Sequence, residues 1–176
     1  MRIDLDFKDC ELNGYSIESF EIDGKKYQKL LKGDFLIMDN TPQLVETYKT
    51  FLLKAEGSVL INGLGMGLCC KYLLSKSSIT DITVVELDKG TIDIVQPNFS
   101  DERLTIIHDS AFDYQPPEEK VYDYVWHDIW FYYTSKNLKD MNILFEKYNK
   151  IAKWQGAWNR DKCMELQQKE INFSLK

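Results

Sequence analysis

Of the 176 residues, 44% are hydrophobic and 28% are charged, a balance typical of one soluble domain with a single core. The formal net charge of −6 and the pI near 5.0 mean that the protein has no overall positive charge to attract the phosphates of a nucleic acid. We therefore expect no nucleic-acid partner. No apolar run approaches the roughly 20 residues that cross a bilayer, and no secretory leader is recognisable, so we expect a cytoplasmic protein without a membrane partner.

Four cysteines, Cys10, Cys69, Cys70 and Cys163, show no spacing typical of zinc or redox sites, and we interpret them as reduced thiols in a protein with no metal site.

The first 40 residues predict a β-hairpin. Side chains alternate from residue 15 to 39 with the period of a half-buried strand, and Asp23-Gly24 is a preferred two-residue hairpin turn. Gly33-Asp34 marks a second turn before the short apolar run 35–38. Four lysines are interpreted as a solvated face of this hairpin: Lys25, Lys26, Lys29 and Lys32.

The rest of the chain, residues 41–176, predicts an α/β core in the same domain. Thr41 and Pro42 are typical of a helix start. Strands are expected near 59–62, 82–86, 104–107, 122–127 and 155–158, and helices near 66–75, 89–96, 137–153 and 161–173. This alternation indicates a Rossmann-like, doubly wound, mostly parallel sheet.

The C-terminal edge of this sheet is predicted to be truncated, because little more than a helix follows Trp158. An exposed sheet edge invites pairing with another chain. We therefore expect either the N-terminal hairpin or a second subunit, in a homo-oligomer, to cover it.

Three glycines follow the strand at 59–62, at positions 63, 65 and 67. Residues without Cβ allow a sharp strand-to-helix turn and let a ligand approach the main chain, although a purely structural turn has the same composition. Glu86 ends the next strand, where an acid in doubly wound folds accepts hydrogen bonds from ribose hydroxyls. Leu68 stands where a dinucleotide fingerprint needs its third glycine, which argues against NAD.

Residues 58–130 resemble the class I S-adenosylmethionine-dependent methyltransferase superfamily, and within it the spermidine synthase-type branch. Four motifs occur in order, at 59–67, 85–88, 106–111 and 122–128. The whole chain also resembles short phage-type members. The resemblance implies an S-adenosylmethionine site made of Asn62, Gly63, Leu64, Gly65, Met66, Gly67, Glu86, Leu87, Asp109, Ser110 and Ala111, with Asp109 on the adenine amine.

Two departures from the spermidine synthase motifs argue against a polyamine substrate. Met66 stands where spermidine synthases carry an Asp in the glycine turn, and Asp128 is followed by Ile129-Trp130-Phe131 instead of their Asp-Ser-x-Asp-Pro motif. An uncharged Met66 suits a methyl donor at least as well, and its alternative role is that of the first packed residue of the helix.

Asp128 and His127 are the predicted catalytic residues. Asp128 would bind an amine or hydroxyl acceptor, and the ordinary pKa of a histidine suits proton transfer near neutral pH. Adjacent strand residues point to opposite faces, so only one of the two can face the ligand, and a packed strand histidine is the alternative for His127. Aromatic residues at 126 and 130–133 are expected around the site or in the core.

The predicted function is therefore an S-adenosylmethionine-dependent methyltransferase acting on a small-molecule or protein acceptor. Two alternatives stay open. One is a spermidine synthase-like aminopropyltransferase that uses decarboxylated S-adenosylmethionine, and the other is a cofactor-binding module without catalytic activity.

Overall fold

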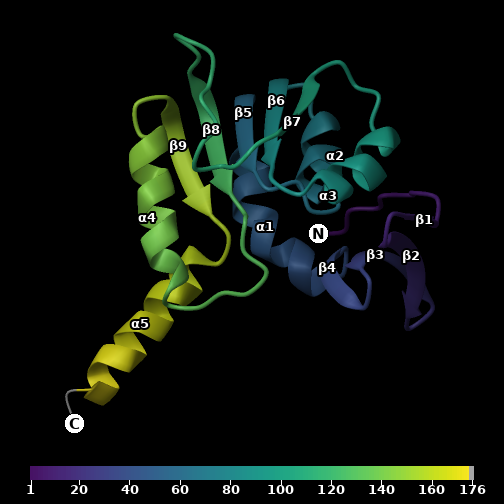
Figure 1. Cartoon of the computed structure of the whole chain (residues 1–176), viewed down its shortest axis with the longest axis horizontal. Helices are drawn as coiled ribbons and strands as arrows, with labels where there is room; N and C mark the ends of the chain where they lie inside the picture. Colours follow the sequence, from purple (N-terminus) through teal and green to yellow (C-terminus); the bar gives the residue numbers. More distant parts are fainter. Residues whose placement is uncertain (175–176) are drawn as a thin grey trace.

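The computed structural model describes residues 1–174, which form two β-sheets with helices packed around them (Figure 1). The N-terminal sheet is antiparallel with strand order β1-β2-β3-β4, and the second sheet has the order β7-β6-β5-β8-β9. Every pairing in the second sheet is parallel. The predicted Rossmann-like α/β fold is confirmed.

The N-terminal sheet is larger than the predicted hairpin. It contains β1 (Cys10–Leu12), β2 (Tyr15–Ile22), β3 (Lys25–Lys32) and β4 (Phe35–Asp39). The turn between β2 and β3 is the expected one, because Asp23 and Gly24 both have positive φ angles, 51° and 71°. The short, exposed β1 was not predicted, since three residues show no periodicity.

The parallel sheet contains β5 (Gly57–Asn62), β6 (Ile79–Glu86), β7 (Leu104–His108), β8 (Tyr122–His127) and β9 (Ala152–Ala157). The helices are α1 (Pro42–Lys54), α2 (Leu68–Leu74), α3 (Lys89–Val95), α4 (Asn137–Tyr148) and α5 (Arg160–Ser174). A short 3-10 turn, Gln96–Asn98, follows α3.

Helices cover both faces of the parallel sheet, because successive side chains of a strand point to opposite faces. On β5, Val59 and Ile61 pack in one buried cluster with residues of α1, α2 and α3. Leu60, between them, belongs to a second cluster with Leu144 and Tyr148 of α4. The central strand is therefore buried on both sides.

The helix predicted over 137–153 ends earlier, at Tyr148. Its apolar stripe lies in the core as expected, with Leu144 and Tyr148 fully buried. Residues 152–157 instead pair with β8, starting with Ala152 beside Tyr122. The last strand therefore begins three residues before the predicted 155–158, because pairing with a buried neighbouring strand outweighs local helix propensity.

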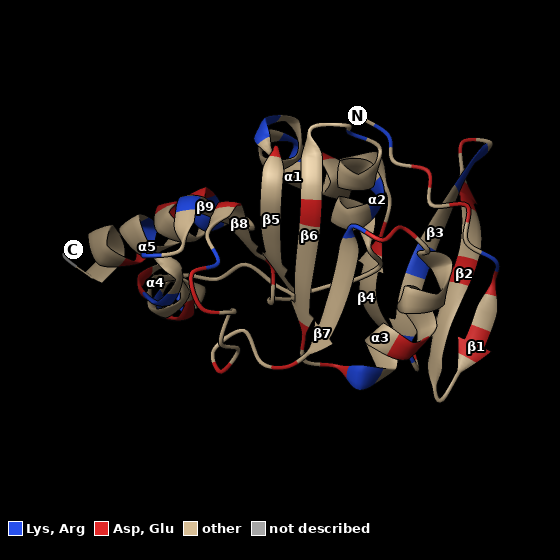
Figure 2. Cartoon of the chain, turned by 90° about the horizontal axis from the view of Figure 1, so that it is seen from above, with Lys and Arg blue, Asp and Glu red and all other residues tan. Residues whose placement is uncertain are grey.

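The N-terminal sheet lies beside α3, on the β7 side of the parallel sheet, whereas β9 lies at the other side with α4 and α5 (Figures 1 and 2). The ring of Tyr15, on β2, packs against Gly90 of α3. The expectation that the hairpin covers the β9 edge is therefore wrong, and a second subunit on that edge stays a prediction. None of the helices within residues 1–174 is long and apolar enough to cross a membrane.

Candidate functional site

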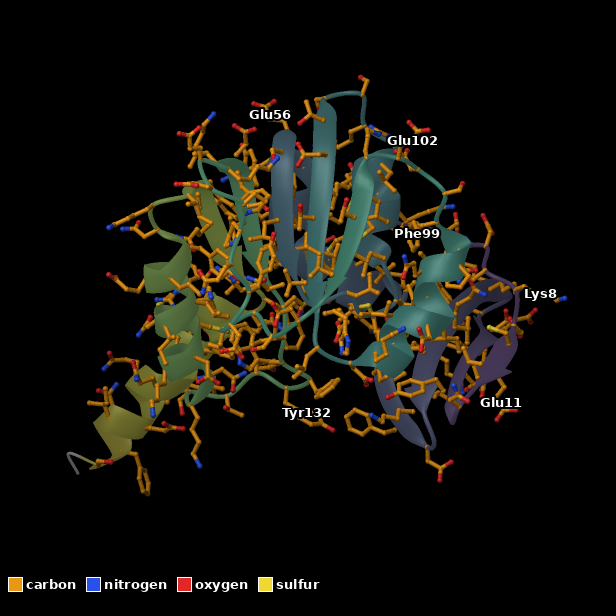
Figure 3. All side chains as sticks on the ribbon, turned by 45° about the horizontal axis from the view of Figure 1, so that its top comes forward. Lys8, Glu11, Glu56, Phe99, Glu102 and Tyr132 are labelled. Atoms are coloured by element: carbon orange, nitrogen blue, oxygen red, sulfur yellow. The ribbon has the colours of Figure 1, made fainter. Side chains whose placement is uncertain are left out.

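A cavity of about 650 Å³ opens at the carboxyl ends of the parallel strands and is also lined by β3, β4 and α1. Figure 3 shows the two ends of the sheet: Glu56 and Glu102 mark the amino ends of β5 and β7, and Tyr132 lies at the opposite end. The carboxyl ends are where open α/β sheets bind their ligands. The volume is within the range of about 300 to 1,000 Å³ that is usual for small-molecule sites.

The glycine turn between β5 and α2 forms part of the cavity wall. Gly63 and Gly65 line the cavity and have φ angles of 102° and 49°, a region that favours glycine. A Cβ on Gly63 would lie 2.0 Å from the carbonyl oxygen of Asp128. Gly67, with φ of 73°, lies against the ring of Phe99 and not in the cavity. The turn therefore needs glycine for its own packing as well as for access to a ligand.

Glu86 joins this turn to the turn after β6. One carboxylate oxygen accepts the Leu64 N–H at 2.7 Å, and the other accepts the Asp88 N–H at 2.7 Å. Glu86 lines the cavity, and each carboxylate oxygen has a second lone pair for a ligand hydroxyl. Glu86 therefore connects the glycine turn to the cavity wall.

Asp88 and Lys32 are cavity residues that the sequence predictions missed. The Asp88 carboxylate accepts hydrogen bonds from the Tyr15 hydroxyl at 2.7 Å, from Lys32 Nζ at 3.2 Å and from the Gly90 N–H at 3.0 Å. Burial alone would raise the pKa of Asp88, but these three donors outweigh burial and lower it. Lys32 is therefore a cavity residue paired with an acid, not a merely solvated lysine.

The loop after β7 forms part of the cavity wall with two small residues. Ser110 and Ala111 line the cavity as predicted, together with Leu87 and Phe112. Asp109 is not among the lining residues, because its carboxylate turns back to accept the Ser110 N–H at 2.7 Å. The structure thus brings the predicted adenine-side loop to the cavity without the Asp109 side chain.

Three further predicted cofactor residues lie beneath the cavity surface. Asn62 and Met66 are fully buried, and Leu64 is nearly so. The Met66 side chain belongs to the core, and its N–H donates to the Met38 sulfur at 3.2 Å. Met66 is therefore packed, as in its alternative role, but it precedes α2. Met38, another cavity residue that was not predicted, lies on the glycine turn.

Asp128 lies in the cavity wall directly after β8, where its N–H donates to the Asn62 carbonyl at 2.8 Å. Burial raises the pKa of this carboxyl to about 7 and the nearby Glu86 charge adds to the increase, while the Tyr48 hydroxyl acts in the opposite direction. This carboxyl therefore changes its protonation state near neutral pH. A group with such a pKa can both donate and accept a proton under ordinary conditions.

His127 points to the other face of the sheet and is fully buried. Its Nδ1 accepts a hydrogen bond from the Asn62 amide at 2.8 Å, so its Nε2–H donates to Gln155 Oε1 at 3.1 Å. Burial lowers the pKa of the imidazole to about 4, which keeps it neutral. The structure therefore does not bring His127 to the cavity, and the proton-transfer role predicted for it is corrected to its alternative, a packed strand histidine.

The predicted aromatic residues divide among the cavity, the core and the surface, where Tyr132 and Tyr133 are exposed. Trp130 and Phe131 line the cavity, and the Phe131 ring meets Phe35 of β4 edge-on at 5.1 Å. Trp126 instead stacks on Phe51 of α1 at 4.8 Å within the core. Phe35 was not predicted, because its partner follows almost a hundred residues later in the chain.

Several solved structures have a similar fold. Spermidine synthase from Thermotoga maritima matches 86% of this chain with a TM-score of 0.53 at 16% sequence identity. The chain therefore has a fold similar to that of this spermidine synthase. The match covers 53% of the Thermotoga chain, so this protein spans about half the length of that relative.

Two further structures match less closely. A spermidine synthase in complex with the transition-state analogue AdoDATO matches 85% of this chain and 63% of its own, with 16% identity and a TM-score of 0.49. The plantazolicin methyltransferase BpumL in complex with SAH matches 62% of this chain and 41% of its own, with 17% identity and a TM-score of 0.46. No family model matches the sequence. No curated protein matches it either.

Proposed function

We propose that this protein is an S-adenosylmethionine-dependent methyltransferase. The proposal depends on one observation: the glycine turn, Glu86 and Asp128 all line a single cavity at the carboxyl ends of the parallel strands. In doubly wound folds a nucleotide-type ligand binds at this end of the sheet.

The cavity residues fit the chemical groups of this cofactor. Glu86 can accept hydrogen bonds from ribose hydroxyls, and Gly63 and Gly65 leave the main chain open to the methionine portion. The small Ser110 and Ala111 leave space for a planar base. When bound, S-adenosylmethionine supplies a methyl group that is activated by a positively charged sulfur.

Asp128 would orient the acceptor and take up its proton. Its pKa of about 7 leaves a substantial ionised fraction at neutral pH, and the carboxylate lies in the cavity wall. A positioned base of this kind removes the proton that the acceptor atom loses as its lone pair bonds to the methyl carbon and the carbon–sulfur bond breaks.

The charge of the cavity favours methyl transfer over aminopropyl transfer to a polyamine. The acids that line it are Glu86, Asp88 and Asp128. Glu86 is bonded to two backbone N–H groups, and Asp88 is paired with Lys32. One acid is left for an acceptor with several positive charges, and each buried charge needs a partner.

Titration calorimetry with S-adenosylmethionine, S-adenosylhomocysteine and the decarboxylated cofactor tests the proposal. We expect the first two to bind, and Glu86→Gln to weaken both by roughly 10- to 100-fold, the effect of losing hydrogen bonds to a charged group. Glu56→Gln, at the opposite end of the sheet, is the matched control and should bind like the parent.

Each other result has a distinct meaning. Equal binding by Glu86→Gln and the parent would remove the site assignment. Tighter binding of the decarboxylated cofactor would replace methyl transfer by aminopropyl transfer, and binding without turnover on any amine or hydroxyl acceptor would favour a binding module.

A further inference from the structure

The cavity has two chemically different halves, which follow the strand order β7-β6-β5-β8-β9. Glu86, Asp88 and Ser110 lie at the ends of β6 and β7, on one side of the glycine turn of β5. The residues after β8 and β9 lie on the other side. We call this second side the acceptor half; it includes Phe35, Leu44, Tyr48, Asp128, Phe131 and Trp158.

Helix α1 encloses the acceptor half because it packs on β8 and β9. Phe51 stacks on Trp126 at 4.8 Å and lies 6.2 Å from the ring of Trp154. The Trp158 indole N–H also donates to Thr47 at 2.9 Å. These contacts hold the Trp158 ring and the Tyr48 hydroxyl as fixed walls of the acceptor half.

The acceptor half is mostly apolar. Among the described residues that line it, Asp128 is the one ionisable acid, and the hydroxyl of the buried Tyr48 lies beside it. Lys32 is the cross-strand partner of Phe35, but its ammonium group is paired with Asp88 of the other half. A molecule bound here therefore meets one side-chain carboxyl, that of Asp128, among mostly aromatic and aliphatic side chains; the buried Trp130 indole N–H, which has no partner among the described residues, is a further hydrogen-bond donor.

Two aromatic rings form the entrance of the acceptor half from opposite parts of the chain. Phe35 projects from β4 and Phe131 from the loop after β8, with ring centroids 5.1 Å apart and planes at 88°. Both are partly exposed, Phe35 by 37% and Phe131 by 57%. Exposed aromatic faces at the mouth of an apolar cavity are typical of a ligand-binding site.

We propose, on the basis of the methyltransferase function proposed above, that the acceptor is a planar aromatic compound with one hydroxyl group, bound in the acceptor half. Its ring would lie against Phe131, Phe35 and Trp158, and its hydroxyl would donate to the Asp128 carboxylate. A polyamine is a poor occupant, because its several charges would lose water among apolar walls that offer one carboxylate.

Calorimetry on protein saturated with S-adenosylhomocysteine tests this assignment without requiring turnover. The probes are 2-naphthol, its saturated counterpart decahydro-2-naphthol, and spermidine. We expect 2-naphthol to bind at least about tenfold more tightly than the other two, because only its ring can make aromatic contacts.

Two variants locate the binding site. Phe131→Leu and Phe35→Leu keep an apolar side chain but remove the aromatic face, and each should weaken 2-naphthol binding several-fold without changing the affinity for S-adenosylhomocysteine. Phe173→Leu is the matched control, because Phe173 is 83% exposed on α5, which contributes no residue to the cavity.

Failure of this inference differs from failure of the proposed function. If S-adenosylhomocysteine binds but decahydro-2-naphthol or spermidine binds as tightly as 2-naphthol, the aromatic acceptor is wrong and the methyltransferase proposal stands. Unchanged 2-naphthol binding by both leucine variants would also overturn the inference. A protein that does not bind S-adenosylhomocysteine overturns both proposals.

Discussion

Asp128 lies in the cavity wall and has a pKa of about 7. Burial is the main cause of this raised pKa, and the Glu86 charge adds to it. The folded protein therefore holds this proton more tightly than the unfolded chain. The stability that results is fully present below pH 4 and is lost as the pH rises through 7. At pH 8 an ionised, buried carboxylate remains in the folded state, and it destabilises the fold.

We therefore expect Asp128→Asn to be more stable than the parent at pH 8, by roughly 2 to 4 kcal/mol, and to lose this advantage towards pH 4. Urea unfolding at the two pH values measures the difference, with Asp34→Asn in an exposed turn as the control. The variant should still bind S-adenosylhomocysteine but fail to turn over. An equal gain in stability at both pH values would contradict the shifted pKa.

His127 has the opposite dependence on pH. Burial lowers its pKa to about 4, so the unfolded chain binds a proton that the folded protein does not. Its contribution is present above pH 6.5 and is lost as the pH falls to 4. His127→Gln should be less stable than the parent at pH 7, by about 1 to 3 kcal/mol, because Asn62 and Gln155 lose a fitted partner.

The same variant should lose less stability between pH 6.5 and pH 4 than the parent does, which unfolding curves at both pH values will show. His108→Gln, at an exposed histidine, is the control. A His127→Gln protein with the parent's slope would show that another group causes the acid sensitivity.

At the scale of elements, the β5–α2 turn depends on its glycines in two separable ways. Gly63 has a positive φ, and its missing Cβ also leaves room for the Asp128 carbonyl oxygen, 2.0 Å from the ideal Cβ position. Gly14 has a positive φ of 82° with no atom within 4 Å of its Cβ position. The pair therefore separates backbone strain from steric exclusion.

We expect Gly14→Ala to destabilise the protein by about 1 to 2 kcal/mol, the cost of a left-handed conformation for alanine. Gly63→Ala should be destabilised more than this and should also lose affinity for S-adenosylhomocysteine, because the β5 and β8 ends must separate. Thermal unfolding and calorimetry measure the two effects. Equal destabilisation by both variants would show that the turn relaxes around the added methyl group.

At the scale of the whole molecule, the N-terminal sheet is joined to the parallel sheet through Asp88. Tyr15 and Lys32 come from the first sheet, and Asp88 caps α3 in the second through the Gly90 N–H. The Tyr15 hydroxyl is 2.7 Å from both carboxylate oxygens. This contact connects the position of the N-terminal sheet to the wall of the cavity.

Tyr15→Phe should therefore lower the free energy of unfolding by about 1 to 3 kcal/mol and weaken S-adenosylhomocysteine binding, since Asp88 loses a charge-assisted partner. Tyr27→Phe is the matched control: Tyr27 is equally buried on the same sheet, and its hydroxyl bonds to none of the described residues. Similar losses in the two variants would show that the Tyr15–Asp88 contact is not the link.

The sequence by itself determined most helices and strands of the parallel-sheet core and their order along the chain. Alternating apolar segments, the glycine turn and the acid that ends β6 are local patterns, and parallel strands bring their carboxyl ends to one edge. Gly63, Glu86, Asp109 and Asp128 were therefore expected around one crevice; Gly63, Glu86 and Asp128 line the cavity, and Asp109 does not. The choice between His127 and Asp128 was open, because alternation excludes one residue without saying which.

Only the tertiary structure decided the partners that lie far apart in the chain. Lys32 pairs with Asp88, which lies 56 positions later in the chain, and Phe35 contacts Phe131, which lies 96 positions later. Such contacts depend on how the two sheets pack against each other, and a local sequence pattern does not predict that packing. The start of β9 and the burial of His127 were likewise decided by a neighbouring strand and by α4, because long-range pairing and burial outweigh local propensity.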